Sequence, residues 1–504
     1  MTTRNDVLSG GVAALIASGA AGAADKAVDN PAYFSASMLL RLFREGDLSP
    51  VDVLERQIAR IEAVNTKVNG ISAKHYDAAR AAARDSEQRY KAGCPRPLEG
   101  ITIGVKDEYS VKGWVVTMGS ASMADSAPKQ ADDAVIERLR AAGAILHIQT
   151  TVPEFYLWAT TASTHGGVTR NPWNLAYSPG GSSGGSAAAL AAGFATLALG
   201  SDMGGSIRIP ASLSGLYGFK PPFGRVPTSE TAYESGGPLA RTFDDLNLLT
   251  QVMSGPHPLN HASIRPGLDY PKRYESVDGW KVAYDPMPEM SPLDPSVQTA
   301  MEQAIRGLQD IGVTVERVDL GFSVSDWPTY LLGLGSSSLG ALLPEDGMDM
   351  STVSPYVSYV SGEIAGAVGP RALVATDALA ARYHASVQEK VFGRGFHALI
   401  TPALATPFLP ANHGMNPTVD TVLIGGTPVS GLGFNPNWVW NLLNRYPVVA
   451  VPIGQGPNKI PIGMQIVGNT FDDLAAFSLA SAWSQAAPQF FTGDAFPDFR
   501  HQMN

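Results

Sequence analysis

The chain has 504 residues, of which 44% are hydrophobic and 16% charged, so it can bury a large core in one to three domains. The formal net charge of −10, with no basic run, argues against a nucleic-acid or membrane partner, because both need concentrated lysine and arginine. The single cysteine, Cys94, excludes an intrachain disulfide, and with no metal-ligand spacing among the histidines the sequence predicts no metal and no cofactor.

Residues 1–24 resemble an export signal. Arg4 precedes an apolar stretch that begins at Val7, and Ala21-Gly22-Ala23 provides the small residues of a cleavage site. The segment also resembles a twin-arginine signal in which Asn5 replaces the second arginine. An Ala-rich N-terminal helix explains the same residues, so a cytoplasmic and a periplasmic or secreted location both stay open.

The next part of the chain predicts alternating helices and strands. Ser49-Pro50 is typical of a helix start, with a cap before a proline in the first turn. Alternation over 98–105 predicts a strand directly before Lys106, and a helix over 131–142 is followed within a few residues by a strand over 144–148. Strand, helix and strand with short connections indicate an α/β fold with a largely parallel sheet.

The pattern continues into a second half with weaker signals. The uncharged stretch 186–194 predicts a helix buried on all sides, and 195–199 predicts a strand whose following loop, 200–206, lies where open α/β sheets bind ligands. We interpret 255–436 as elaboration around the site, within one domain of residues 30–500. Further strands are expected over 280–284, 313–318, 397–401, 448–452 and 460–467, and further helices over 295–310 and 472–486.

The Gly/Ser-rich segment "YSPGGSSGGSAAAL", residues 177–190, has several interpretations. A flexible linker is disfavoured because an apolar helix follows at once, and a phosphate loop is disfavoured because no lysine follows the last glycine. The segment also matches G-x-S-x-G with Ser183 in the centre, which is the pattern of an α/β-hydrolase nucleophile. An esterase of that kind would need a late histidine, for which His397 and His413 are the candidates.

A fourth interpretation combines three motifs in order. Lys106 stands in "GVKD", Ser182 in "SPGGSSGGS" and Ser206 in "GSDMGGSIRIP", 76 and 24 residues apart. This order and wording closely resemble the amidase signature family of serine hydrolases, most densely over 98–227, with weaker matches elsewhere, including "PIGMQIVG" near the C-terminus. The resemblance implies a large mixed, mostly parallel central sheet covered by helices on both faces.

The resemblance also implies a reaction. Ser206 would be the nucleophile, Ser182 a proton-relaying serine preceded by a cis peptide bond, and Lys106 the base. The expected enzyme is an amidohydrolase that works through an acyl-enzyme on a small-molecule amide, with ester or carbamate cleavage as further activities. An amidotransferase A-type subunit and a catalytically inactive binding protein stay open as alternatives, and so does a homodimer.

The proposed chemistry makes a demand on the lysine. A serine hydroxyl needs a base to remove its proton, and the three motifs contain no histidine. Burial favours the neutral amine of a lysine, provided that no carboxylate pairs with it. The adjacent Asp107 and Glu108 are therefore expected to point away from Lys106.

The residues around the three motifs have expected supporting roles. Backbone N–H groups of Met203, Gly204, Gly205 and Ser206 would form an oxyanion hole. Loop support is expected from a second set, in which the last two members would pair: Gly181, Ser183, Asp202 and Arg208. Aromatic residues are candidates for an apolar substrate pocket, although core packing explains them as well: Tyr156, Trp158, Phe434, Trp438 and Trp440.

Overall fold

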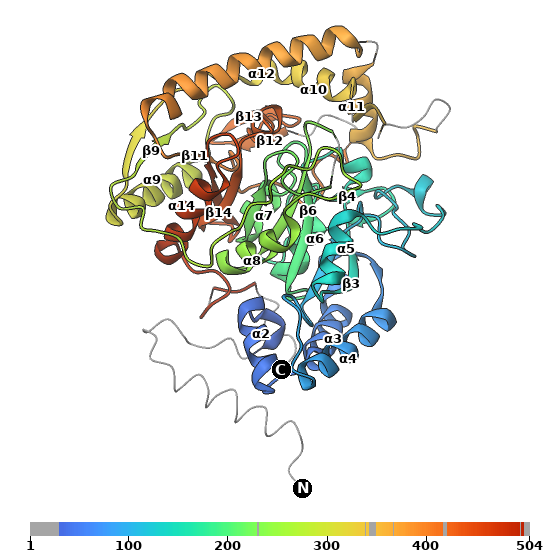
Figure 1. Ribbon diagram of the computed structural model, residues 1–504. Helices are drawn as coiled ribbons and strands as arrows, with labels where there is room; N and C mark the ends of the chain where they lie inside the picture. The colour runs from blue at the N-terminus through green and yellow to red at the C-terminus, as the bar shows by residue number, and fades with distance from the viewer. Residues whose placement is uncertain are drawn as a thin grey trace.

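The computed structural model describes residues 30–497, except 229–230, 338, 342–348, 366, 417–420 and 494. The expected export signal in residues 1–24 lies outside the described residues. An 11-stranded sheet runs through the described part of the chain, with helices packed against it (Figure 1). None of the described helices is both long and apolar enough to cross a membrane.

The sheet is mixed. Its strand order is β1-β3-β2-β6-β8-β7-β14-β15-β11-β9-β10, and six of its ten neighbouring pairs are antiparallel. The large mixed sheet is confirmed, but the expectation that it is mostly parallel is wrong, because β7–β8 and β14–β15 return without a crossover helix. The strands are β1 (Ile71–Lys74), β2 (Thr102–Lys106), β3 (Ile145–Thr150), β6 (Leu197–Asp202), β7 (Tyr217–Lys220), β8 (Ser235–Ala240), β9 (Lys281–Tyr284), β10 (Thr314–Arg317), β11 (Ala398–Pro402), β14 (Val448–Gln455) and β15 (Pro461–Val467).

Helices account for most of the remaining regular structure. Two short two-stranded sheets lie apart from the main one, β4 (Ala162–Ser163) with β5 (Gly167–Val168) and β12 (Thr421–Ile424) with β13 (Thr427–Ser430). The helices are α2 (Ala36–Glu45), α3 (Pro50–Val68), α4 (Tyr76–Lys91), α5 (Ala134–Ala141), α6 (Gly184–Ala191), α7 (Arg208–Ser214), α8 (Phe243–Met253), α9 (Pro295–Asp310), α10 (Trp327–Gly335), α11 (Pro355–Ile364), α12 (Pro370–Lys390), α13 (Val439–Leu442) and α14 (Asp473–Ala486).

Strand periodicity places helices on both faces of the sheet. In β6, Leu197 and Leu199 pack into the core that contains α5, α8, α9 and α14, whereas Ala198 packs into the core that contains α6 and α7. Helix α6 is buried on every side, as the uncharged sequence predicts, and its alanines let it lie close to the sheet. Helices α6 and α7 both begin beside the carboxyl end of β6, which brings two Gly/Ser-rich loops together.

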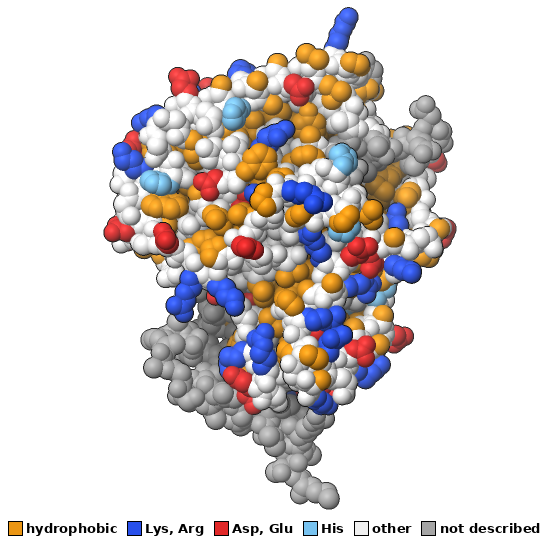
Figure 2. Space-filling view, viewed as in Figure 1, with side chains coloured by type: hydrophobic (Ala, Val, Ile, Leu, Met, Phe, Trp, Pro, Cys, Tyr) orange, Lys and Arg blue, Asp and Glu red, His pale blue; other side chains and the backbone are white. Residues whose placement is uncertain are grey.

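The stretch 255–436 contributes in two ways. Its strands β9, β10 and β11 belong to the main sheet. Its helices α10, α11 and α12 gather at one end of the molecule, where they build a third hydrophobic core, with Tyr330, Tyr356 and Tyr383 among its buried residues (Figure 1). Helices α10 and α11 contribute to one wall of the site described below. On the face shown in Figure 2, acidic and basic side chains are interspersed between hydrophobic patches.

Candidate active site

Lys106 lies at the centre of a buried polar cluster. It is the last residue of β2 and its side chain is fully buried. Its Nζ donates hydrogen bonds to Ser182 Oγ at 2.8 Å and to Ser201 Oγ at 2.7 Å. The same Nζ lies 2.9 Å from Glu108 Oε2. The structure therefore brings together Lys106 and Ser182, which stand 76 residues apart in the chain.

The loop that carries Ser182 lies against the loop that carries Ser206. The peptide bond between Gly181 and Ser182 is cis. The backbone N–H of Ser183 donates to the Ser206 carbonyl at 3.2 Å, which ties the two loops together. A side chain at Gly181 would come within 2.7 Å of the Trp158 carbonyl oxygen, so this close approach requires glycine.

An internal ion pair holds the second loop, residues 202–206. Asp202 and Arg208 are fully buried, with Arg208 Nη2 2.8 Å from Asp202 Oδ1. Desolvation opposes the charge of Asp202, but Arg208 overcomes it and lowers the pKa of Asp202 to about 2. Asp202 also accepts hydrogen bonds from the N–H groups of Gly205 at 2.8 Å and Ile207 at 3.1 Å. The carboxylate therefore fixes the backbone of the loop.

The hydrogen bond from Gly205 to Asp202 corrects the expectation that Gly205 belongs to the oxyanion hole. Because Gly205 N–H donates to Asp202, it is not free to bind a developing oxyanion. The glycine is needed for a different reason. Its φ is +112°, and a side chain there would come within 2.6 Å of Asn437. The candidate donors that remain are the N–H groups of Met203, Gly204 and Ser206.

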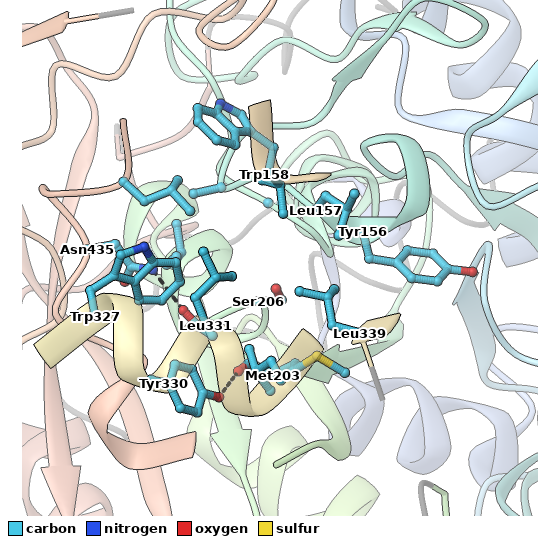
Figure 3. Close-up of a pocket in the computed structure, with 17 residues that line it drawn as sticks. Tyr156, Leu157, Trp158, Met203, Ser206, Trp327, Tyr330, Leu331, Leu339 and Asn435 are labelled. Atoms are coloured by element: carbon cyan, nitrogen blue, oxygen red, sulfur yellow. Dashed lines mark hydrogen bonds between the residues drawn. The ribbon is translucent and has the colours of Figure 1, made fainter. Parts of the chain in front are cut away.

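A pocket opens over Ser206, whose side chain lies among the lining residues (Figure 3). One wall comes from η3 (Glu154–Tyr156) and the residues after it, and the opposite wall comes from α10. Apolar side chains dominate the lining, and no charged side chain contributes to it among the described residues. The lining residues are Tyr156, Leu157, Trp158, Ala159, Gly181, Met203, Gly204, Ser206, Ile209, Trp327, Tyr330, Leu331, Leu334, Leu339, Val360, Leu432 and Asn435.

The aromatic residues named from sequence divide into two groups. Tyr156 and Trp158 line the pocket. Phe434, Trp438 and Trp440 do not line it, because their side chains are buried in the hydrophobic cores. Trp438, for example, stacks on Tyr330 with ring centroids 5.4 Å apart and so supports the pocket wall from behind.

Two residues that the sequence did not single out hold the 202–206 loop. Tyr330 donates its hydroxyl to the Met203 carbonyl at 2.6 Å, and Asn435 donates its amide to the Gly204 carbonyl at 2.8 Å (Figure 3). Both also line the pocket. Trp327-Pro328, a proline in the first turn, is a signal that could have revealed helix α10, although not what its tyrosine contacts.

The esterase alternative, with Ser183 as nucleophile and a late histidine as base, can be compared with the contacts of these residues. Ser183 Oγ donates to the Ser201 carbonyl at 3.3 Å, and the residue is fully buried ahead of α6. His413 Nδ1 accepts from Trp158 at 3.1 Å, and His397 Nδ1 accepts from the Lys281 backbone at 3.1 Å beside β9. These imidazole contacts do not orient a base toward Ser183. No group of three or more His, Cys, Asp or Glu side chains within the described residues is placed to hold a metal ion.

Comparison with known proteins identifies the family of this chain. A family model described as Amidase matches residues 52–476. The chain belongs to the amidase signature family. The glutamyl-tRNA(Gln) amidotransferase A subunit of Ralstonia nicotianae is 31% identical to it over 475 residues, which cover 87% of this chain and 95% of that protein. The protein of the same name from Carboxydothermus hydrogenoformans is 30% identical over 484 residues, which cover 90% of this chain and 97% of that protein.

Solved structures agree with this membership. A bacterial aryl acylamidase of the amidase signature family superposes with a TM-score of 0.82 at 28% identity, over 91% of this chain and 97% of that one. A 6-aminohexanoate cyclic dimer hydrolase, solved with its substrate, superposes with a TM-score of 0.78 at 26% identity, over 91% and 98%. The chain is therefore an amidase signature enzyme, of a family that acts on C–N bonds.

One expectation for this amidase signature enzyme is wrong. Asp107 does point away from Lys106, because its carboxylate accepts hydrogen bonds from Gln149 at 2.7 Å and from the Thr117 N–H at 2.9 Å. Glu108 does not point away and pairs with the lysine at 2.9 Å. The chain turns directly after β2, and this turn brings the side chain of Glu108 back onto the end of the strand.

Proposed function

We propose that the enzyme is an amidohydrolase that cleaves amides with an apolar group beside the scissile C–N bond, through an acyl-enzyme on Ser206. The pocket around Ser206 carries this proposal, because its lining is apolar and aromatic with no charged side chain among the described residues. Such a pocket gains free energy by burying an apolar acyl or aryl group. Two polar side chains of the lining, Tyr330 and Asn435, contact the loop that would bind the carbonyl oxygen.

The side chains support a proton relay. Ser206 Oγ would attack the amide carbonyl carbon while its proton passes to Ser182, whose own proton passes to Lys106 across the 2.8 Å hydrogen bond. The backbone N–H groups of Met203, Gly204 and Ser206 would stabilise the oxyanion. Reversal of the relay would protonate the leaving amine, and water would then release the acyl group by the same route.

A second candidate function is that of an amidotransferase component, because the curated relatives named above carry that name. An amidotransferase that draws its nitrogen from glutamine would have to hold the charged α-amino and α-carboxylate groups of that substrate. The apolar lining offers them no opposite charge, so we favour the hydrolase. The aryl acylamidase likeness points in the same direction.

The test compares substrates on the isolated chain. We expect hydrolysis of an N-aryl amide with an apolar acyl group, and of the matching ester, with kcat/KM at least about tenfold above that for glutamine, a difference of about 1.4 kcal/mol. Ser206→Ala should lower turnover at least about a thousandfold, because the nucleophile is lost. His397→Gln is the control and should leave turnover within about twofold of wild type.

Three results would contradict the proposal. Preference for glutamine, or activity only when partner proteins are added, would favour the amidotransferase. Loss of turnover in the histidine variant with full activity in Ser206→Ala would favour the esterase alternative. A folded wild-type protein that neither turns over these substrates nor reacts covalently at Ser206 would favour a binding protein.

A further inference from the structure

The Lys106 amine has a carboxylate among its three close polar contacts. An ammonium has three N–H donors, and the Lys106 amine has three acceptors within 2.9 Å, which are Ser182 Oγ, Ser201 Oγ and Glu108 Oε2. A neutral amine has only two N–H donors, and it could accept a proton from Ser182 only with its lone pair. To act as the base, Lys106 has to direct that lone pair at Ser182 while its amine lies 2.9 Å from the Glu108 carboxylate.

Glu108 is built into this cluster. Its side chain is 18% exposed, and its Oε2 accepts a hydrogen bond from Ser201 Oγ at 2.6 Å. Desolvation opposes its charge, but the ion pair with Lys106 and hydrogen bonds with Glu234 and Ser201 hold the pKa of Glu108 below its ordinary value. Ser201 thus accepts from the lysine and donates to the carboxylate, which supports the charged form of both partners.

Other titratable groups surround the pair from several elements. The ring of Tyr156 lies 5.0 Å from Lys106 Nζ and also favours a cation. Tyr109 donates its hydroxyl to the Gly200 carbonyl, away from the amine. Among the described residues, Glu108 is the carboxylate that forms an ion pair with Lys106. The titratable groups that interact with Glu108 are Lys106, Asp107, Tyr109, Asp133, Tyr156 and Glu234.

We infer that Glu108 is a positioning residue of the proton relay and that, as the counter-ion of Lys106, it sets the pH at which this lysine becomes a base. The inference rests on the proposed function, in which Lys106 accepts the proton of Ser182. Before that step the ammonium must release one proton to water. The negative charge of the Glu108 carboxylate opposes this release. The pH at which activity rises to half of its maximum is therefore higher than it would be without Glu108.

The test replaces the carboxylate by its uncharged isostere. The rate at which an alkyl fluorophosphonate labels Ser206 is measured from about pH 5 to 10, because this reaction needs an activated nucleophile but no natural substrate. The Ser206 oxygen bonds to phosphorus, fluoride leaves, and the serine proton enters the relay. In Glu108→Gln we expect the half-maximal pH to fall by about 1 to 3 units, the usual effect of one close opposite charge.

Matched variants separate this effect from general damage. Asp133 lies near Glu108, but its carboxylate accepts from the Ser110 N–H at 2.7 Å and does not contact the lysine. Asp133→Asn should therefore keep the half-maximal pH of wild type, and Glu108→Asp should stay close to it. Ser201→Ala removes the hydrogen bonds of Ser201 with Lys106 and Glu108. This variant should lower the pH of half-maximal labelling as Glu108→Gln does, but by less.

The outcomes are distinguishable. If folded Glu108→Gln has the same pH of half-maximal labelling as wild type, or a higher one, the inference is overturned while the proposed function stays intact. If circular dichroism shows that Glu108→Gln does not fold, the Ser201→Ala profile decides in the same way. If Ser206 of wild type is not labelled at any pH, the proposed function itself fails.

Discussion

Single side chains determine the shape of the 202–206 loop, which carries the candidate oxyanion donors. Asp202 holds it from within through the Gly205 and Ile207 N–H groups, and Tyr330 and Asn435 hold its carbonyls from the pocket side. The conformation of this loop would affect the rate, because an oxyanion donor acts only at the correct distance from the developing charge. Tyr330 therefore links the wall that would bind substrate to the loop that would stabilise the transition state.

Tyr330→Phe tests this link. The variant keeps the ring that stacks on Trp438 but loses the hydrogen bond to the Met203 carbonyl. We expect kcat to fall about threefold to tenfold with little change in KM, as a loss of about 0.5 to 1.5 kcal/mol in the transition state alone would give. Steady-state kinetics on an N-aryl amide provides the measurement.

A matched control is available nearby. Tyr383 is another buried tyrosine of the same core, and its hydroxyl donates to Asp326 at 2.6 Å, away from the loop. Tyr383→Phe should leave kcat within about twofold of wild type. Equal losses in the two variants would show that general destabilisation, not loop position, explains the effect.

At the scale of elements, strand β3 carries a buried titratable group beneath the site. His147 is fully buried, and its Nε2 lies 2.8 Å from the Phe194 carbonyl. Desolvation lowers the pKa of His147 to about 4, so the folded protein holds the neutral imidazole. The unfolded chain binds a proton near pH 6.5. Stability from this residue is therefore complete above pH 6.5 and is lost as the pH falls toward 4.

His147→Gln should remove this part of the acid sensitivity. A glutamine amide can still donate to the Phe194 carbonyl but does not titrate. Between pH 6.5 and 4 we expect the free energy of unfolding to fall by about 3 kcal/mol more in wild type than in the variant. Urea unfolding at several pH values measures both curves, and parallel curves would show that His147 is not held neutral.

At the scale of the whole molecule, long-range ion pairs join parts of the fold that are distant in sequence. Arg225 follows β7 and Asp473 begins α14, yet Arg225 Nε lies 2.9 Å from Asp473 Oδ1, across 248 residues. Tyr270 donates to the same carboxylate at 2.7 Å. Removing one partner of a buried pair leaves the other charge uncompensated, so this contact holds α14 to the segment that follows β7.

Asp473→Asn should lower the free energy of unfolding by about 3 kcal/mol, because Arg225 would remain charged and buried. The neighbouring Asp472→Asn is the control, since asparagine can still cap α14 at the Ala475 N–H. Denaturant unfolding compares the midpoints of the two variants. Equal midpoints would mean that the ion pair adds little to stability.

How far the sequence predicts this protein depends on whether the signal is local. Hydrophobic periodicity predicted β3 and β15 close to their observed bounds, uncharged composition predicted α6, and helix caps predicted α3, whereas β2 begins at Thr102 and not at residue 98. Strand direction was not predictable in the same way, because β7 and β8 pair through residues outside any local motif. The motif spacing brought Lys106, Ser182 and Ser206 to notice, and the family model agrees with the family that they indicated.

The sequence by itself determined the family, the candidate catalytic residues and the combination of helices and strands, because each rests on short motifs or on local periodicity. Only the tertiary structure decided which side chains meet. The structure pairs Glu108 with Lys106, brings Tyr330 and Asn435 to the 202–206 loop, and buries Trp438 in the core. These contacts join residues from different elements, and a contact between distant segments leaves no periodic trace in a single sequence.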